Sequence, residues 1–582
     1  MNLDGATACS SRLLLRMRSA RVFALGPTAP AQSITLRRDR LGLALSLFSM
    51  LNIATMPFKA YLSECWPWTA PPVVPELPSN YTLFNAMALA ANQAAYTASS
   101  LPPKATYYSD TKESVQVARQ TLRLGREPLE YAECIDAYLL GVPGLVFYTR
   151  AQVDLVCRVL AVTPNATSSV DWPHQGSCFR GRFLGFEIGY ACLWLTPGDA
   201  ILGDLNATDV ITLNYAYTEM RYDKWLWAKL GYRIGITMFV VCRMWSRYYR
   251  HCVALERALR SFGHMRQLAP GPWRYELVVG DPTAIVLLDP WIAAAFVLDM
   301  WFSCSTLAIA ILRATQNADV VVFFLNTLYL SRTVWFAFLA LSLVAHGLQR
   351  YQKEQLFVDV DPTCLTIAVA VYGPLATWLN GNLGILVRLG QWFITLTVPD
   401  KNRGQVNEAV FGSAFYTSGL ACIPVVYGFL MAAARRQRRL RDYSNRRYNG
   451  VKNRFLLNLL SSLRRVSPNL ARGGTVYALQ ALNARYKSCP TISLRGADCY
   501  LLCYKDGALN ETIRLSLLQS LQLHPANAEL AVHASTEVSP YIFNTLVVPP
   551  TVTVPMATCT VGSVAASRFE LQRPAAASAW CM

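Results

Sequence analysis

The sequence predicts an α-helical polytopic membrane protein with six transmembrane helices and an α+β extracytoplasmic domain between helices one and two. Two observations lead to this prediction. Of the 582 residues, 53% are hydrophobic and only 15% are charged, whereas about 25% of the residues in ordinary soluble domains are charged. In addition, apolar segments of about 20 residues, the length that crosses a bilayer as a helix, recur along the chain.

Six apolar segments are the predicted spans. The second contains Lys229 and Arg233, and the fourth contains Arg332 within the stretch LYLSRTVWFAF. The six segments are 41–58, 225–245, 291–312, 319–345, 364–380 and 409–434.

Basic residues indicate how the predicted spans are oriented, because Lys and Arg collect on cytoplasmic flanks. Seven Arg precede the first segment, and the basic runs RMWSRYYRHC and RRQRRLRDYSNRR follow the second and the sixth. Region 59–224 instead has 12 Lys and Arg against 16 Asp and Glu. We therefore expect 59–224 to lie outside, and 1–40, the loop 246–290 and the chain beyond 434 to lie in the cytoplasm.

The predicted outer region contains residues suited to an oxidising, glycosylating compartment. The glycosylation pattern N-x-S/T occurs there at Asn80, Asn165 and Asn206. Disulfides are expected in such a compartment. The candidate disulfide cysteines, whose pairing the spacing leaves open, are Cys134, Cys157, Cys178 and Cys192, with Cys65 left over.

The segment 381–408 is apolar enough to be a seventh span, but a crossing there would place the basic run after 434 outside. It also contains Arg388 near the middle of its apolar part. We therefore interpret it as a re-entrant segment between the last two spans or as a helix lying at the membrane interface.

The predicted cytoplasmic tail has three parts. Residues 435–465 contain eleven Lys and Arg against one Asp, which suits anionic lipid head groups, although an ordinary basic flank of a span explains the charge equally well. Residues 466–545 are expected to form a small domain, and 546–582 a disordered tail. The expected partners are thus membrane lipids and a second copy of the chain in a homo-oligomer, and no nucleic acid.

The N-terminal region bears on localisation. It is rich in Arg and Ser and poor in acidic residues, as mitochondrial presequences are. The glycosylation patterns and the long first apolar segment favour a signal anchor instead. We expect an integral protein of the secretory pathway or plasma membrane, with a mitochondrial membrane as the alternative.

Motifs of common catalytic sites do not occur in the sequence. It has no GxxxxGK[ST], HExxH, GxSxG or kinase signature. We therefore expect no enzymatic activity, no cofactor and no metal site.

Two charges inside predicted spans are the main candidate site. A charge near the bilayer centre is costly and usually has a partner. Asp299 and Arg332 fall at similar depths on consecutive, antiparallel spans, so we expect them to form an ion pair. Such a pair would be either a structural clamp between the two helices or part of a permeation site. A third arrangement is a cation–π contact of Arg332 with Trp335 or Phe336. The candidate pathway residues are Asn326, Tyr329, Thr333 and Arg388.

Three stretches carry a resemblance: LVVGDPTAIVLLDPWI, LYLSRTVWFAFLALSLVAHGL and FVDVDPTCLTIAVAVYGPLATWL. They resemble a family of uncharacterised multi-pass membrane proteins of oomycetes, over about 275–435. The resemblance implies helical membrane architecture and no particular activity. Six spans with a large outer loop after the first are also similar to polycystin- and mucolipin-like cation channels, but no acidic selectivity filter is visible here.

Two functions are compatible with these observations. The first is movement of an ion or small solute by a channel- or transporter-like protein, favoured slightly because charges inside spans are expensive. The second is a non-transporting surface glycoprotein with a receptor-like or adhesive role. The segment 381–408 discriminates between them, since a re-entrant loop lining a wet cavity favours transport and a surface helix over a filled core favours the second function.

Overall fold

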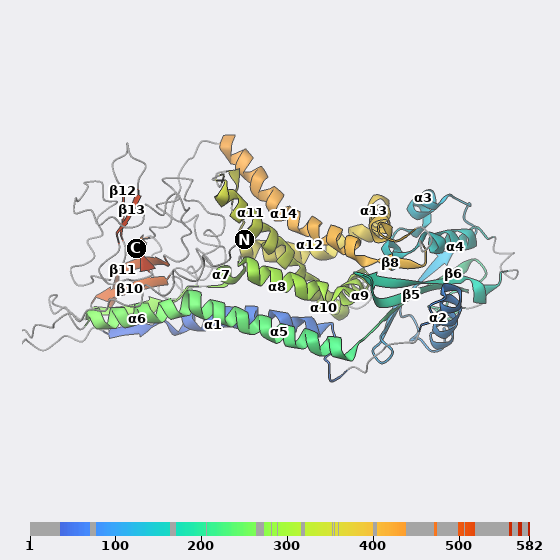
Figure 1. The fold of residues 1–582 in the computed structure, drawn as a ribbon, viewed down its shortest axis with the longest axis horizontal. Coiled ribbons are helices and arrows are strands. Elements are labelled where there is room, and N and C mark those ends of the chain that lie inside the picture. The colour runs from blue at the N-terminus through green and yellow to red at the C-terminus, as the bar shows by residue number, and fades with distance from the viewer. Residues whose placement is uncertain are drawn as a thin grey trace, which may run out of the picture.

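The computed structural model describes residues 35–69, 77–162, 170–204, 207–263, 273–280, 282–287, 289–315, 320–351, 353, 356–358, 360–399, 404–437, 471–473, 499–505, 507–517, 558–561, 569–572 and 580–581. Helices run along the long axis of the molecule, with a β-sheet at each end (Figure 1).

One end is a sheet domain formed mainly by the region after the first helix. Its six strands lie in the order β2-β3-β6-β5-β4-β8, and all neighbours are antiparallel except β4 and β8. The strands are β2 Tyr107–Asp110, β3 Val115–Arg123, β4 Gly176–Phe183, β5 Phe186–Pro197, β6 Val210–Glu219 and β8 Val406–Glu408.

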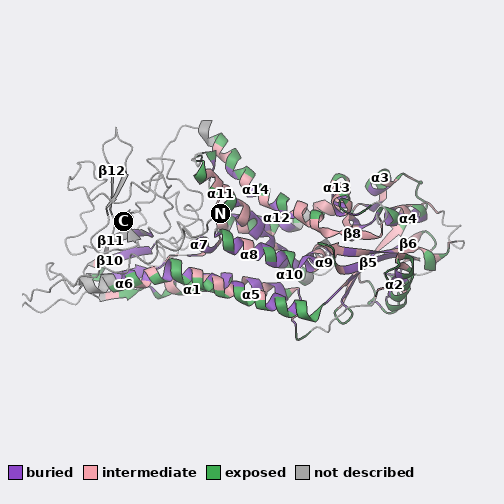
Figure 2. Cartoon of the chain, in the orientation of Figure 1, coloured by how far each residue is buried: buried purple, intermediate pink, exposed green. Residues whose placement is uncertain are grey.

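Helices cover both faces of this sheet. Helix α2 (Tyr81–Ala95) packs on one face against side chains such as Trp194, whereas α4 (Arg150–Leu160) packs on the other face with Leu193. Successive strand residues point to opposite faces, so a strand covered on both sides is buried along most of its length. That is the burial pattern of β5 and β6 (Figure 2).

The helical layer between the two sheets has broken and continuous helices. Two of its helices bend, by 59° between α1 and the 3₁₀ turn η1 and by 73° between α8 and α9. The elements of the layer are α1 Arg40–Ala54, η1 Met56–Leu62, α5 Asp223–Met244, the π-helical turn η6 Trp245–Tyr249, α6 Arg250–Gly263, α7 Thr283–Leu287, α8 Pro290–Trp301, α9 Cys304–Thr315, α10 Val320–Leu330, the 3₁₀ turn η7 Ser331–Thr333, α11 Val334–Arg350, α12 Pro362–Asn382 and α14 Ala409–Gln437.

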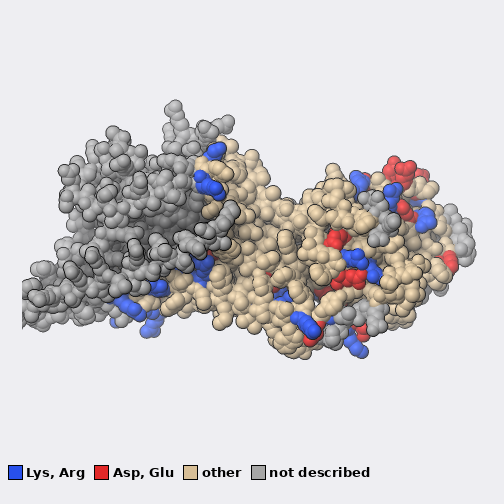
Figure 3. All heavy atoms as spheres, in the orientation of Figure 1, with Lys and Arg blue, Asp and Glu red and all other residues tan. Residues whose placement is uncertain are grey.

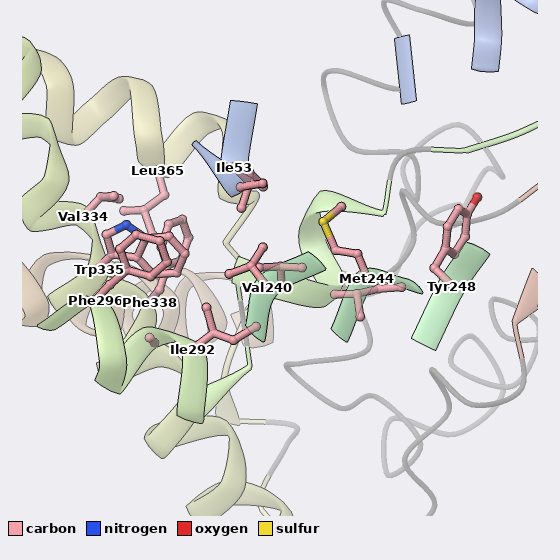
Figure 4. Packing of buried hydrophobic residues seen from close by; sticks show 14 of the residues in the cluster. Ile53, Val240, Met244, Tyr248, Ile292, Phe296, Val334, Trp335, Phe338 and Leu365 are labelled. Atoms are coloured by element: carbon pink, nitrogen blue, oxygen red, sulfur yellow. The ribbon is translucent and has the colours of Figure 1, made fainter. Parts of the chain in front are cut away.

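A close-packed apolar core holds this layer together (Figure 4). The ring of Trp335 on α11 stacks on that of Phe296 on α8, with centroids 3.9 Å apart. Ile53 of α1 and Val240 of α5 belong to the same buried cluster. The layer is therefore filled by interlocking side chains where these helices meet.

A second sheet closes the other end and joins segments that are far apart in the sequence. Its central path is β1-β7-β10-β11, with β9 and β14 also pairing with β11. The predicted N-terminal segment, the loop after the second apolar segment and the tail thus share one sheet. The strands are β1 Thr35–Arg38, β7 Trp273–Val278, β9 Ala471–Gly473, β10 Cys499–Lys505, β11 Ala508–Leu517 and β14 Trp580–Cys581.

The predicted six-helix polytopic bundle is wrong. Within the described residues, two helices are long and apolar enough to cross a membrane, Phe323–Leu348 and Ala409–Ala434, or up to four if each bent pair counts as one span. The second predicted span fails because charged residues interrupt α5, and the first and third are broken by the bends. The likeness to six-span cation channels is lost with the six spans.

Two further segments were expected to lack a place in a folded domain or sheet. In segment 381–408, helix α13 (Gly384–Thr395) packs on the sheet domain, where Val387 is buried, and β8 is a strand of that domain. The tail from 546, expected to be disordered, contains the strand pair β12 (Thr558–Val561) and β13 (Phe569–Gln572) as well as β14.

Candidate functional site

A cluster of five charged side chains is buried inside the helical layer, and we call it the charge cluster. It consists of Glu64, Lys229, Arg233, Asp299 and Arg332, whose side chains are each at most 7% exposed. Three cations face two carboxylates, so the cluster has a formal charge of +1.

The two carboxylates are bridged by one guanidinium. Nε of Arg233 donates to Oδ1 of Asp299 at 2.8 Å, and its Nη2 donates to Oε1 of Glu64 at 2.8 Å. Nη2 also donates to the hydroxyl of Ser303 at 3.0 Å. The guanidinium of Arg233 lies over the ring of Tyr61, 4.6 Å from its centroid. Arg233 is therefore the centre of the cluster.

The other two cations bind at the edges. Arg332 donates through Nη2 to Oδ2 of Asp299, and its Nη1 lies 3.6 Å from Oε1 of Glu64. Nζ of Lys229 donates to Oε2 of Glu64 at 3.2 Å. Burial would by itself raise the pKa of the Glu64 carboxyl, but the three cations hold this pKa well below its ordinary value.

Local breaks in the helices bring these residues together. Glu64 follows the turn η1, Asp299 precedes the bend between α8 and α9, and Arg332 lies in the turn η7 between α10 and α11. Only α5 passes the cluster as an unbroken helix, with Lys229 and Arg233 one turn apart on the same face. A short 3₁₀ turn inside a long helix is typical of a functional hinge or of a sequence under strain.

The structure brings the expected pair Asp299 and Arg332 together. The cation–π contact of Arg332 is made with Tyr329, 5.0 Å from the ring centroid, rather than with Trp335 or Phe336. Tyr329 donates its hydroxyl to Oε1 of Glu64 at 2.9 Å.

The remaining pathway candidates divide into two groups. Asn326 is buried on α10, and the Thr333 hydroxyl donates to the carbonyl of Leu330 at 2.6 Å. Arg388 is remote from the charge cluster, because it lies on α13 and pairs with Asp136 of the sheet domain at 2.7 Å. The structure therefore does not bring Arg388 together with the other pathway candidates.

Four cysteines of the sheet domain form two disulfides, Cys134–Cys157 and Cys178–Cys192. Cys65 is a free thiol. Asn80 is exposed at the start of α2, where its Oδ1 accepts from the backbone of Thr82.

Several predictions fall outside the described residues. They are the glycosylation sites Asn165 and Asn206, and the basic segment 435–465 apart from its first three residues. The described residues contain no group of His, Cys, Asp and Glu arranged to hold a metal ion.

Sequence reasoning missed Glu64, Lys229 and Arg233 as members of the cluster, and Ser303 as a hydrogen-bond partner of Arg233. A signal for two of them was present, since two basic residues four apart in an apolar segment share a helix face and need partners there. Glu64 gave no such signal, because it follows the first apolar segment in a stretch with ordinary polar residues.

Comparisons with known proteins add nothing to this assignment, since the chain matches no protein-family model, no curated protein sequence and no solved structure.

Proposed function

We propose that the protein is embedded in a membrane through its helical layer and acts as a non-transporting surface glycoprotein with a receptor-like or adhesive role. In this proposal the sheet domain lies outside and contacts the external partner. The charge cluster holds the helices of the layer in one fixed arrangement.

The surface of the helical layer supports membrane embedding. On the face drawn in Figure 3, charged side chains gather over the sheet domain and near the opposite end, and few lie over the helices between them. Large apolar side chains are exposed on the helices of the layer, for example Phe48 on α1, Met238 on α5 and Val371 on α12, at 64–69%. Exposed apolar surface of this extent is typical of contact with lipid or with another protein.

The state of the charge cluster is the observation that carries the non-transporting role. Each of its five charges is bonded to an opposite charge, and the side chains around it are close-packed. Buried charges paired in this way fix one arrangement of helices, because removal of either carboxylate leaves buried cations uncompensated. The segment 381–399 supports this choice only in part, because its helix α13 packs on the sheet domain and not over the core of the helical layer.

One observation favours the second candidate function, movement of an anion. The cluster has one cation in excess, and Nη1 of Arg233 and Nη1 of Arg332 have no hydrogen-bond partner among the described residues. Two such donors could hold an anion for an instant during passage.

An efflux measurement separates the two candidates. The purified full chain is reconstituted into liposomes. One set is loaded with chloride, and a second set is loaded with potassium and a pH dye that reports potassium release. The rate of ion release from each set is compared with that from protein-free liposomes. We expect release no faster than in the protein-free control. Saturable chloride release that Arg332→Met abolishes would establish transport instead.

A further inference from the structure

An apolar cavity of about 130 Å³ lies where the sheet domain meets the helices. Its walls come from strands of the sheet, from α9, from α13 and from the first two turns of α14. The lining includes Phe179, Tyr215, Leu307, Ala308, Ile394 and Phe415. A cavity of similar size, about 150 Å³, and similar lining stays dry and takes up benzene, so this one has room for an apolar group of roughly six carbon atoms.

Polar groups in the cavity wall offer little to a charged ligand. The side-chain amide of Asn407 donates to the carbonyl of Phe147 at 2.7 Å, and the Ser413 hydroxyl donates to that of Val410 at 2.8 Å. The buried hydroxyl of Tyr217 is different, because it has no hydrogen-bond partner among the described residues. An uncharged apolar group therefore suits the cavity.

The cavity is continuous with a helix suited to contact lipid. Ala409, Gly412 and Phe415 at the start of α14 line the cavity. Farther along the same helix, Val426, Tyr427 and Leu430 are 49–64% exposed, and Ala409–Ala434 is long and apolar enough to cross a membrane. An acyl chain lying along α14 in a bilayer would thus contact the helix that forms one wall of the cavity.

We propose that this cavity binds the fatty acyl chain of a membrane lipid. The proposal rests on the membrane embedding proposed above. Roughly six carbons at the end of the chain fill the apolar volume, and the rest of the chain lies along α14. Because the cavity joins the sheet domain to α9 and α14, bound lipid stabilises the contact between the outer domain and the helices.

Photocrosslinking of the full chain tests this site. A phosphatidylcholine with a diazirine on one acyl chain is mixed into vesicles that hold the protein, and crosslinked peptides are mapped by mass spectrometry. We expect crosslinks within 304–312 and 409–416, with signal that excess unlabelled lipid displaces. The variant Ala308→Trp fills the cavity and should lower this crosslinking at least tenfold, whereas Ala433→Trp on the exposed face of α14 should not.

Two further measurements keep the outcomes apart. Crosslinks that spread over the exposed face of α14 and resist both competition and Ala308→Trp would overturn the site. The acyl chain could also come from a free fatty acid, so a diazirine fatty acid is added to the protein in detergent. Labelling by this fatty acid and not by the phosphatidylcholine would overturn a membrane lipid as the ligand. Flotation of the chain with vesicles tests embedding separately, so a failed crosslink in protein that floats counts against the cavity alone. If Ala308→Trp does not fold, displacement in the unmodified chain still decides.

Discussion

Nε of Arg233 lies 2.8 Å from Oδ1 of Asp299, although the two residues are 66 positions apart on α5 and α8. The same guanidinium reaches Glu64, so one side chain of α5 ties α8 to the segment that follows η1. The expected pair Asp299–Arg332 is thus one edge of a larger cluster. This changes what substitutions at these positions should do.

Replacing Asp299 should cost more than replacing Arg332. Asp299→Asn leaves three cations facing Glu64 alone, and breaking a buried pair in this way costs about 3–5 kcal/mol. Arg332→Met leaves two cations and two carboxylates, so we expect a smaller loss of about 1–3 kcal/mol, as for one lost partner of a buried group. Thermal unfolding of the two purified variants in the same detergent gives the order.

The double variant Asp299→Asn with Arg332→Met should be more stable than Asp299→Asn alone, because it removes one of the uncompensated cations. Recovery should be partial, since Arg233 still lacks one of its two carboxylates. Equal or lower stability of the double variant would show that Asp299 and Arg332 do not act as a pair. The exposed pair Arg388 and Asp136, neutralised by Arg388→Met, is the matched control and should change stability by less than about 1 kcal/mol.

Acid should destabilise the fold through Glu64. The cations hold its pKa below the ordinary value of 4.5 despite burial, so the unfolded chain takes up a proton at a higher pH than the folded chain. The stabilisation from Glu64 is therefore complete above about pH 4.5 and is lost as the pH falls toward the folded pKa. Unfolding temperatures measured from about pH 7 down to about pH 3 should fall on the acid side, with a shallower fall in Glu64→Gln. Parallel curves for both proteins would rule out this role of Glu64.

Thiol labelling should distinguish Cys65 from the four cysteines of the sheet domain. Alkylation of the folded chain without reductant should modify Cys65, which is half-buried and free. Cys134, Cys157, Cys178 and Cys192 should become reactive only after reduction, because they are in disulfides. Peptide mass spectrometry reads each site, and labelling of either pair before reduction would contradict the assignment.

Glycosylation at Asn80 is best tested without disturbing the helix that it begins. Because the Asn80 side chain caps α2, Thr82→Ala removes the glycosylation pattern and keeps the cap. We expect Thr82→Ala to abolish one glycosidase-sensitive mobility shift in chain expressed in eukaryotic cells. Asn80→Asp, which also retains a capping oxygen, is the control and should migrate as Thr82→Ala does. An unchanged shift in both variants would place no glycan at Asn80.

The sequence alone predicted the location of most helices, because each is a distinct apolar segment. It could not show that Thr55 and Phe302 lie at bends, which shorten two of the candidate spans. It also could not show that β1, β7 and β10 form one sheet, since pairing between distant strands depends on register and not on local pattern.

The candidate site was partly predictable for a related reason. The cost of a charge in an apolar segment pointed to Asp299 and Arg332, and the short connection between their helices made them neighbours. Lys229 and Arg233 were visible as charges but were read as weakening a span, because the sequence does not show which way a helix face points. Arg388 was assigned to the pathway for the same reason, although α13 packs on the sheet domain.

The central claim is that the charge cluster is a closed clamp and not a passage. Cysteines introduced at Ser303 and Thr333, which are both fully buried beside the cluster, test it most directly. The chain in liposomes is treated with a charged thiol reagent, and labelling at these two positions is read by peptide mass spectrometry before and after unfolding. The clamp requires that both positions stay unlabelled until the protein unfolds. Labelling of either position in the folded protein would mean that water reaches the cluster, and the clamp would have to be replaced by a pathway.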